Sequence, residues 1–445
     1  MLKLKQLPLA FSLLLGMAAP AHAADADAGN TLKDFFNSAL SYSPSLQAAE
    51  ERWHASDARV SYANGILLPQ VSADANVSKN TYQAGLQAQQ DYNGKRYSLQ
   101  LSQTLFNWQS FANRQQAYLQ SNQAEAEYYG QLAQLLTVVA DNYLTVLQSE
   151  DTVRSMNSEL EAITNQVNQI QKMYNLQLAK VTDLYHAQAQ KAAVQTQLIT
   201  AESELSISKA ALQATTGLAI GELRRLPTDI TLVPLQGPLQ EWLDRAKANN
   251  KQIEASTFAL QAADKAVSAR RGAYLPKVSI VLQRQASDIG YQNAPIARTD
   301  SNYVGIDFSM PLFAGGSNRA LVREAQSQRN VAEDQMRQTS LDVFERARTA
   351  YFKAKAGESR IEASNLSAEA SAASYNAMKR GFELGAVTSV DVLNALRDQF
   401  RAQRDLQQSR YDYLRYKLVL QRESGTLSAK DIEQVSDLLN APPLR

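Results

Sequence analysis

The chain has 445 residues, with 45 Lys and Arg against 44 Asp and Glu, and it contains no cysteine. The lack of cysteine excludes disulfides, thiolate metal sites, a cysteine nucleophile and a cysteine-borne lipid anchor. A formal net charge of +1 gives no basic face, so we expect no nucleic-acid partner. His22, His54 and His186 are too few for a histidine metal cluster, and we expect no metal and no cofactor.

The N-terminus has the parts of a secretory signal peptide. Two lysines precede an apolar run at 7–19, and AHA at 21–23 is a cleavage signal of the A-x-A type. The run is too short to span a bilayer as a helix. We therefore expect residues 1–23 to be removed and the protein to be exported from a bacterial cytoplasm. The remaining chain has no apolar run of ~18 residues, so no membrane helix is predicted.

The rest of the chain is an internal duplication. Four pairs of matching positions lie 207 or 208 residues apart: Pro69 and Pro276, Phe106 and Phe313, Asp183 and Asp391, Gly217 and Gly425. Repeats at a fixed offset predict two copies of one structural unit. We place the first repeat at 24–226, an inter-repeat linker or equatorial belt at 227–238, the second repeat at 239–425, and a C-terminal equatorial segment with a loose tail at 426–445.

Each repeat contains two predicted strands, at about 66–79 and 96–106 in the first and about 274–286 and 302–313 in the second. Their residues alternate between apolar and polar, as in QVSADANVS and PKVSIVLQRQ. Strict alternation over about ten residues is typical of a barrel strand with one apolar and one polar face. An ordinary half-buried hairpin is the alternative. Polar loops are predicted at about 79–95 and 287–302.

Each repeat also contains helices of very different length. Long helices are predicted at about 107–174 and 316–381, short ones at about 182–216 and 389–425, and a leading helix at about 32–63 and 239–272. Apolar residues recur at steps of 3 and 4, which is coiled-coil spacing. A helix of roughly 65 residues is about 100 Å long. We therefore expect two shorter helices to stack end to end beside each long one.

Four strands cannot close a barrel, and an open edge in lipid leaves backbone groups unpaired at several kcal/mol each. The chain must therefore associate. Two copies would give eight strands with a filled interior, and three would give twelve with room for water. Polar strand faces favour the wet lumen. The predicted fold is a mixed α and β membrane protein in which four strands per chain complete a barrel with the strands of other copies, continued by a long α-helical coiled coil.

The sequence MPLFAGG, at 310–316, marks the step from strand to long helix. Pro311 has no backbone N–H and is expected to stop the sheet ladder. Gly315 and Gly316 permit the turn that follows.

The repeated LP-x-V strand starts, MPLFAGG and the helix turn GFELGAVTSVDVLNAL resemble motifs of the TolC family of outer-membrane efflux proteins, over essentially the whole mature chain. The resemblance implies a homotrimer in the bacterial outer membrane, in contact with outer-membrane lipid. In that homotrimer the four strands per chain complete a twelve-stranded outer-membrane barrel, continued by a twelve-helix α-helical coiled-coil periplasmic tunnel. It also implies that a periplasmic adaptor and an inner-membrane pump of the ABC or RND/MFS type dock at the tunnel's closed tip.

The resemblance also places the family's tip residues. The acidic constriction ring falls on Asp391, and the second ring position holds Asn394, so one ring is missing. The positions of the family's closing lock hold Phe382 and Val387, facing Thr182 and Asp183, and the first two cannot make side-chain hydrogen bonds. Another interpretation of Asp391 is a helix N-cap or first-turn carboxylate, and the two roles are compatible.

These patterns predict an outer-membrane exit duct for type I protein secretion, multidrug efflux or both. The alternative is a structural periplasmic coiled-coil protein without a pore. An enzyme is not expected, because the sequence has no Ser-His-Asp set, paired histidines or phosphate loop. The lack of a lipid-anchor cysteine and the tail after the last helix favour the branch that serves protein secretion and general efflux.

Overall fold

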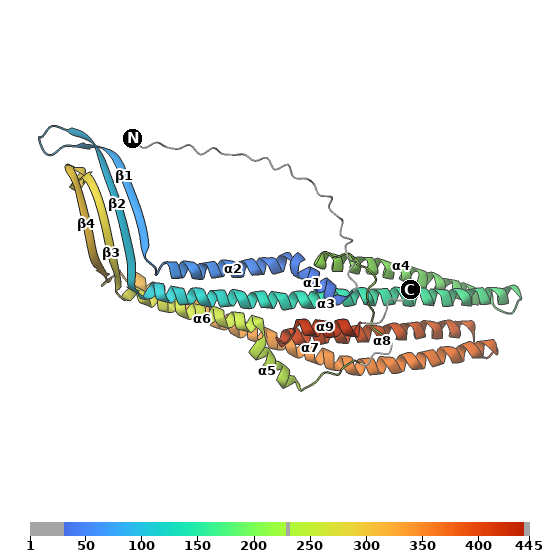
Figure 1. Ribbon diagram of the computed structural model, residues 1–445. Helices are drawn as coiled ribbons and strands as arrows, with labels where there is room; N and C mark the ends of the chain where they lie inside the picture. Colours follow the sequence, from blue (N-terminus) through green and yellow to red (C-terminus); the bar gives the residue numbers. More distant parts are fainter. Residues whose placement is uncertain (1–30, 228–231, 440–445) are drawn as a thin grey trace.

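A computed structural model describes residues 31–227 and 232–439. The predicted signal peptide and the end of the C-terminal tail lie outside the described residues. Four strands form one antiparallel sheet in the order β1-β2-β3-β4: β1 Gln70–Tyr82, β2 Gln90–Asn107, β3 Lys277–Ile289 and β4 Pro295–Ser309. The sheet stands at one end of a long helical body (Figure 1). Among the described strands, β1 and β4 each have a partner on one side only.

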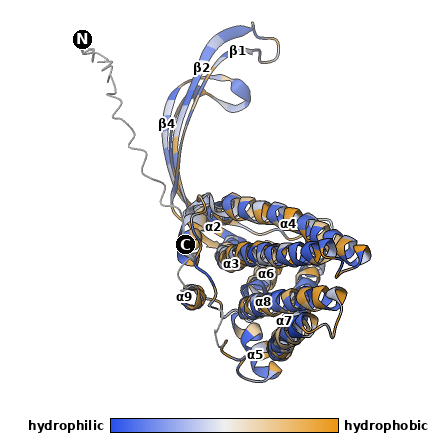
Figure 2. Cartoon of the chain, turned by 90° about the vertical axis from the view of Figure 1, so that its right-hand side faces the viewer, coloured by the Kyte–Doolittle hydropathy of each residue, from blue (hydrophilic) through white to orange (hydrophobic). Residues whose placement is uncertain are grey.

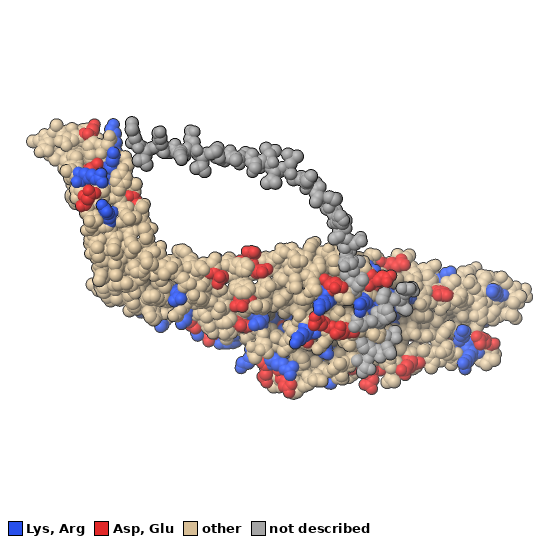
Figure 3. Space-filling model, in the orientation of Figure 1, with Lys and Arg blue, Asp and Glu red and all other residues tan. Residues whose placement is uncertain are grey.

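The strand register aligns the alternating residues into rows. One row of four apolar residues crosses all the strands: Val71, Leu101, Leu282 and Val304. The next row, on the opposite face, is polar: Ser72, Gln100, Gln283 and Tyr303. Val71 and Val304 are 66% and 76% exposed, so the apolar face is uncovered in the single chain. Figure 3 shows charged groups on the part of the sheet far from the helices and none on the part next to the helices in that view.

The predicted strand limits were partly wrong. β1 and β3 start later than predicted, at Gln70 and Lys277. α2 and a turn precede β1, and α6 (Lys251–Arg271) and a short 3-10 turn precede β3. The strands also continue through most of both predicted polar loops, up to the pair Tyr82 and Gln90. Backbone pairing does not need apolar side chains, and polar cross-strand bonds support it, as where Thr81 Oγ1 donates to Asp91 Oδ1 at 2.7 Å. At the other end, β4 stops at Ser309 rather than 313.

The helical body is a wall built around two long helices. The wall helices are α2 Pro44–Gly65, α3 Trp108–Asn175, α4 Val181–Thr216, α6 Lys251–Arg271, α7 Ser317–Glu383 and α8 Ser389–Glu423. α3 and α7 contain 68 and 67 residues. α2 and α4 pack along α3, and α6 and α8 pack along α7, which confirms the end-to-end stacking. α3 also contacts α6 and α8, so the order across the wall is α2-α3-α6-α7 near the sheet and α4-α3-α8-α7 farther away (Figures 1 and 2).

Each predicted leading helix is in fact two helices. α1 Leu32–Tyr42 precedes α2, and α5 Leu239–Asn249 precedes α6. The breaks fall on Ser43 and Asn250, whose backbones are extended and whose side chains accept hydrogen bonds from the next helix. Pro44 adds to the first break because it lacks an N–H and disfavours the α conformation in the residue before it.

The main apolar core lies at mid-height, where α1 and α9 (Ala429–Leu438) cover α3. Phe35 of α1 meets Tyr143 of α3 edge to face, with 5.7 Å between ring centroids. Burial raises the pKa of the Tyr143 phenol. We call α1, α9, 217–227 and 232–238 the belt. None of the helices in residues 31–227 and 232–439 combines the length and the apolar composition that a transmembrane helix requires.

The seam between the two repeats combines apolar packing with a series of polar contacts. Along the contact of α3 with α8, Arg404 Nη1 lies 2.6 Å from Glu159 Oε2, and the Tyr411 hydroxyl donates to Asp151 at 2.7 Å. Farther along, Arg415 donates to Gln148 at 2.7 Å and to Thr145 at 2.9 Å. The Glu159 side chain is only 1% exposed, so its charge depends on Arg404. These contacts fix the register of one repeat against the other.

Arg404→Met should destabilise the protein by about 3–5 kcal/mol, because it leaves the Glu159 carboxylate buried and uncompensated. The double variant Arg404→Met, Glu159→Leu should recover most of that loss. Urea denaturation in detergent, followed by tryptophan fluorescence, measures both. Arg397→Met, at an exposed ion pair with Asp398, is the matched control and should change little. Equal losses in the single and double variants would contradict the prediction.

Candidate functional site

The end of the wall opposite the sheet carries two helix turns, one per repeat (Figure 1). The first joins α3 to α4 and the second joins α7 to α8. Both close with the same bond, since Leu178 N donates to Met173 O and Ala386 N to Gly381 O, each at 2.8 Å. The left-handed residue at each turn is Gln177, with φ 62°, and Gly385, with φ 74°. The two repeats therefore share the turn geometry but have different residues at the left-handed position.

Asp391 occupies the third position of α8 and forms a capping box with Thr388. Its Oδ2 accepts from Thr388 Oγ1 at 2.7 Å and from Thr388 N at 3.0 Å. These bonds favour the ionised form and hold the pKa of the Asp391 carboxyl below its usual range. The first-turn role is thus confirmed. The carboxylate is exposed, so it also carries a negative charge at the tip.

Asn394 lies one helical turn beyond Asp391 and is half-buried. Its neighbour Leu393 packs against Ile170 and Leu184 of the other helix pair. The two predicted ring positions therefore share one side of α8, close to where the two hairpins meet.

The four predicted gate residues lie on both turns. The Thr182 hydroxyl is 3.5 Å from Asp183 Oδ1, and the N-cap before them, Lys180, gives no side-chain cap. Phe382 is half-buried, and Val387 lies over Gly381. Within residues 31–227 and 232–439, no hydrogen bond or ion pair joins Phe382 or Val387 to the other turn. The described part of the chain therefore shows no polar lock that joins Phe382 or Val387 to the other turn.

At the sheet end, the predicted strand-to-helix turn spans the residues between β4 and α7. Gly315 and Gly316 have φ of 58° and 85°, a region that favours glycine. The strand ends two residues before Pro311, so Pro311 follows the end of the ladder. The first repeat does this differently: Asn107 ends β2, and its side chain accepts from Ser110 N to start α3.

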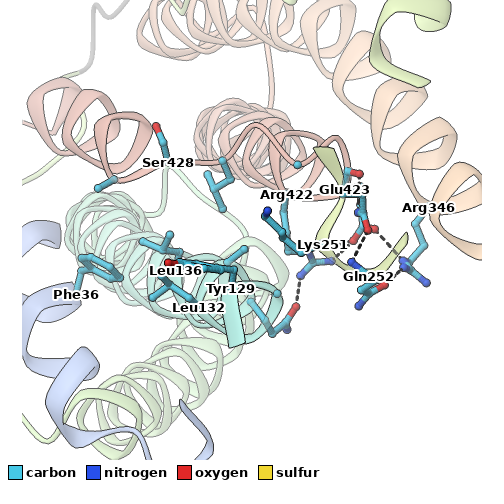
Figure 4. Close-up of a pocket in the computed structure, with 17 residues that line it drawn as sticks. Phe36, Tyr129, Leu132, Leu136, Lys251, Gln252, Arg346, Arg422, Glu423 and Ser428 are labelled. Atoms are coloured by element: carbon cyan, nitrogen blue, oxygen red, sulfur yellow. Dashed lines mark hydrogen bonds and ion pairs between the residues drawn. The ribbon is translucent and has the colours of Figure 1, made fainter. Parts of the chain in front are cut away.

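A cavity of about 390 Å³ at the belt was not predicted from the sequence (Figure 4). Its polar wall centres on Glu423, which pairs with Arg346 Nε at 2.9 Å and with Arg422 Nη2 at 2.6 Å. The opposite wall is apolar and includes Leu132 and Leu136. A sequence signal was available in Gly425, where a Cβ would lie 2.4 Å from the backbone of Asn249. The ion pairs tie the end of α8 to α7 and leave Glu423 fully partnered.

The comparisons with known proteins agree with this architecture. The family model "Outer membrane efflux protein" matches residues 35–218 and 242–426, one match per repeat. The chain therefore belongs to the outer membrane efflux protein family, whose place is the outer membrane.

Two curated relatives and one solved structure illustrate the similarity of this chain to known proteins. The chain is 24% identical to outer membrane protein TolC of Escherichia coli, covering 97% of this chain and 89% of that one. It is also 24% identical to the alkaline protease secretion protein AprF of Pseudomonas aeruginosa, covering 91% and 86%. The crystal structure of outer membrane protein VceC of Vibrio cholerae has a TM-score of 0.75 at 20% identity, covering 88% of this chain and 96% of that one.

Gly385→Ala should destabilise the second turn by about 1 kcal/mol, because alanine in the left-handed region is strained. No other atom lies within 4 Å of the position of the added Cβ, so strain is the only cost. Gln177→Gly should relieve the same strain in the first turn and stabilise it by up to about 1 kcal/mol. Gly130→Ala, inside α3, is the control and should stabilise through helix propensity. Thermal denaturation in detergent compares the three, and the same sign for Gly385→Ala and Gly130→Ala would contradict the assignment.

Proposed function

We propose that the chain is one subunit of a homotrimeric outer-membrane exit duct for type I protein secretion, multidrug efflux or both. The observation that carries the proposal is the four-stranded sheet, which has two unpaired edges, one apolar face and one polar face. Three copies close twelve strands around a wet lumen, with the apolar rows toward lipid. α3 and α7, each about 100 Å long, continue the duct through the periplasm.

A structural coiled-coil protein without a pore is the weaker candidate. Such a protein has no use for a row of exposed apolar residues across a sheet with open edges. The relatives' names support the duct, because AprF is described as a protease secretion protein. On this proposal the pump is an inner-membrane ABC or RND/MFS-type protein, joined to the tip through a periplasmic adaptor.

The proposed organisation keeps the boundaries inferred from the sequence. Residues 24–226 and 239–425 form the two repeats, 227–238 joins them at the belt, and the segment after 425 adds to the belt through α9. Asp391 forms one acidic ring at the periplasmic tip. Asn394 leaves the second ring position uncharged, and the gate is closed without the family's polar lock.

The purified protein should be a trimer that requires detergent. Mass measurement in detergent by light scattering decides this, because two copies would give eight strands and a filled interior. A stable monomer, or a protein that stays soluble without detergent, would rule out the duct.

Asp391→Ala should weaken the cation preference of the pore and its block by trivalent cations from the periplasmic side. Three carboxylates around one axis repel one another, and a passing cation relieves that repulsion. Reversal potentials and single-channel currents in planar bilayers measure both effects. Unchanged selectivity would mean that Asp391 only caps α8.

The cation preference should also depend on pH through Thr388. The pKa of Asp391 is depressed in the folded state, so its charge and its capping bonds persist above the unfolded pKa and are lost as pH falls through the folded value. Thr388→Ala removes a donor and should raise the pH at which cation preference disappears. Thr182→Ala on the other turn is the control. An identical titration in wild type and Thr388→Ala would show that this bond does not tune the ring.

The double variant Phe382→Tyr, Val387→Arg should tighten closure by supplying hydrogen-bond donors that reach Thr182 and Asp183 of the facing turn. Resting conductance in planar bilayers should fall. Asp183→Ala alone should open the wild-type pore little, because Phe382 and Val387 make no polar bond for it to break. A large opening by Asp183→Ala would point to a lock built from other residues.

A further inference from the structure

A groove of about 640 Å³ lies along the seam between α3 and α8, beside the belt residue Arg225. Four arginines line it: Arg154 from α3, Arg225 from the belt, and Arg404 and Arg410 from α8. The acidic residues in the lining are Asp151 and Asp405. The buried Glu159 pairs with Arg404 from behind the lining, so four positive side chains face three negative ones and one positive charge is in excess. We call this cavity the arginine groove.

The acidic side chains nearby do not accept hydrogen bonds from all of the arginine N–H groups. Glu159 is engaged by Arg404, and Asp151 accepts from Tyr411 and pairs with Arg154 Nη1 at 3.0 Å. Two buried nitrogens remain, Arg154 Nη2 and Arg225 Nη1. Neither nitrogen has a hydrogen-bond partner in the described part of the chain.

Arg154 and Arg225 both affect the ionisation of the Tyr411 hydroxyl. Burial and Asp151 raise the pKa of the Tyr411 phenol, and both Arg154 and Arg225 oppose that rise through their charge. Their guanidinium groups are therefore within electrostatic reach of one hydroxyl. Both arginines also line the arginine groove.

The position of the groove keeps it away from subunit contacts. In the order α4-α3-α8-α7, the α3–α8 seam is in the middle of the wall. In the proposed trimer, α4 and α7 are the edges at which neighbouring subunits join. The sheet follows the same rule, since β1 and β4 are its edges. Trimer formation therefore leaves this seam within one chain.

We propose that the arginine groove binds a compact polyanion, a molecule with two or more carboxylate or phosphate groups. Guanidinium forks bind such groups through paired hydrogen bonds, which are stronger than neutral ones. The volume is in the range of small-molecule sites. Side chains of Gln148, Ser155 and Gln403 line the same groove and offer hydrogen bonds to the rest of a polar ligand. This binding does not require that the pore conducts.

The test is calorimetry on the purified full-length protein in a non-ionic detergent at fixed ionic strength. Citrate and inorganic pyrophosphate are titrated separately, with acetate as the monovalent comparison. At least one polyanion should bind saturably, one per chain, at least tenfold more tightly than acetate. The stronger of the two identifies the ligand's anionic group as carboxylate or phosphate.

Arg225→Gln should weaken polyanion binding at least tenfold. Arg225→Lys keeps the charge but loses the fork, and it should also weaken binding. Arg401→Gln is the matched control, an exposed arginine on α8 outside the groove, and should bind like wild type. Thermal denaturation checks that each variant is folded. The proposal is overturned if neither polyanion binds wild type saturably, or if Arg225→Gln and Arg401→Gln bind alike.

Discussion

The constraint on which the structure depends is the pair of unpaired sheet edges. β1 and β4 each expose a row of backbone N–H and C=O groups, and in lipid these groups must find partners. The apolar row from Val71 to Val304 requires a lipid surface, and the polar row beside it requires water. A single chain satisfies neither condition. In the proposed homotrimer, identical copies supply the missing strand partners.

The two repeats share one plan and differ where their surroundings differ. Ser43 and Asn250 break the leading helices at matching positions, 207 residues apart, and both cap the helix that follows. The strand-to-helix steps differ, with a single capping residue, Asn107, in one repeat and a glycine turn in the other. The polar contacts of α8 with α3 have no counterpart in the duplicated pattern, because they join one repeat to the other.

The sequence alone predicted those helices and strands in which apolar residues recur at a regular spacing. Alternation identified four strands, and 3–4 spacing identified the long and short helices, because side-chain burial follows backbone geometry directly. Strand ends were missed because polar residues such as Thr81 and Asp91 pair as well as apolar ones. The break at Asn250 was missed because an asparagine N-cap resembles an ordinary helical residue. Glu159 with Arg404, and the arginine groove, depend on residues more than 200 positions apart, which no local pattern records.

The strand order also suggests the order in which the parts of the chain fold. β1–β2 and β3–β4 are local hairpins, whereas β2 pairs with β3 through residues as distant as Leu101 and Leu282. Closing so long a loop costs more entropy and slows folding. We expect the hairpins and helix pairs to form first, and the β2–β3 pairing only after α3 has docked on α6 and α8. Until then the exposed apolar rows are an aggregation hazard, so the last step needs either the membrane or a protein that shields strand edges.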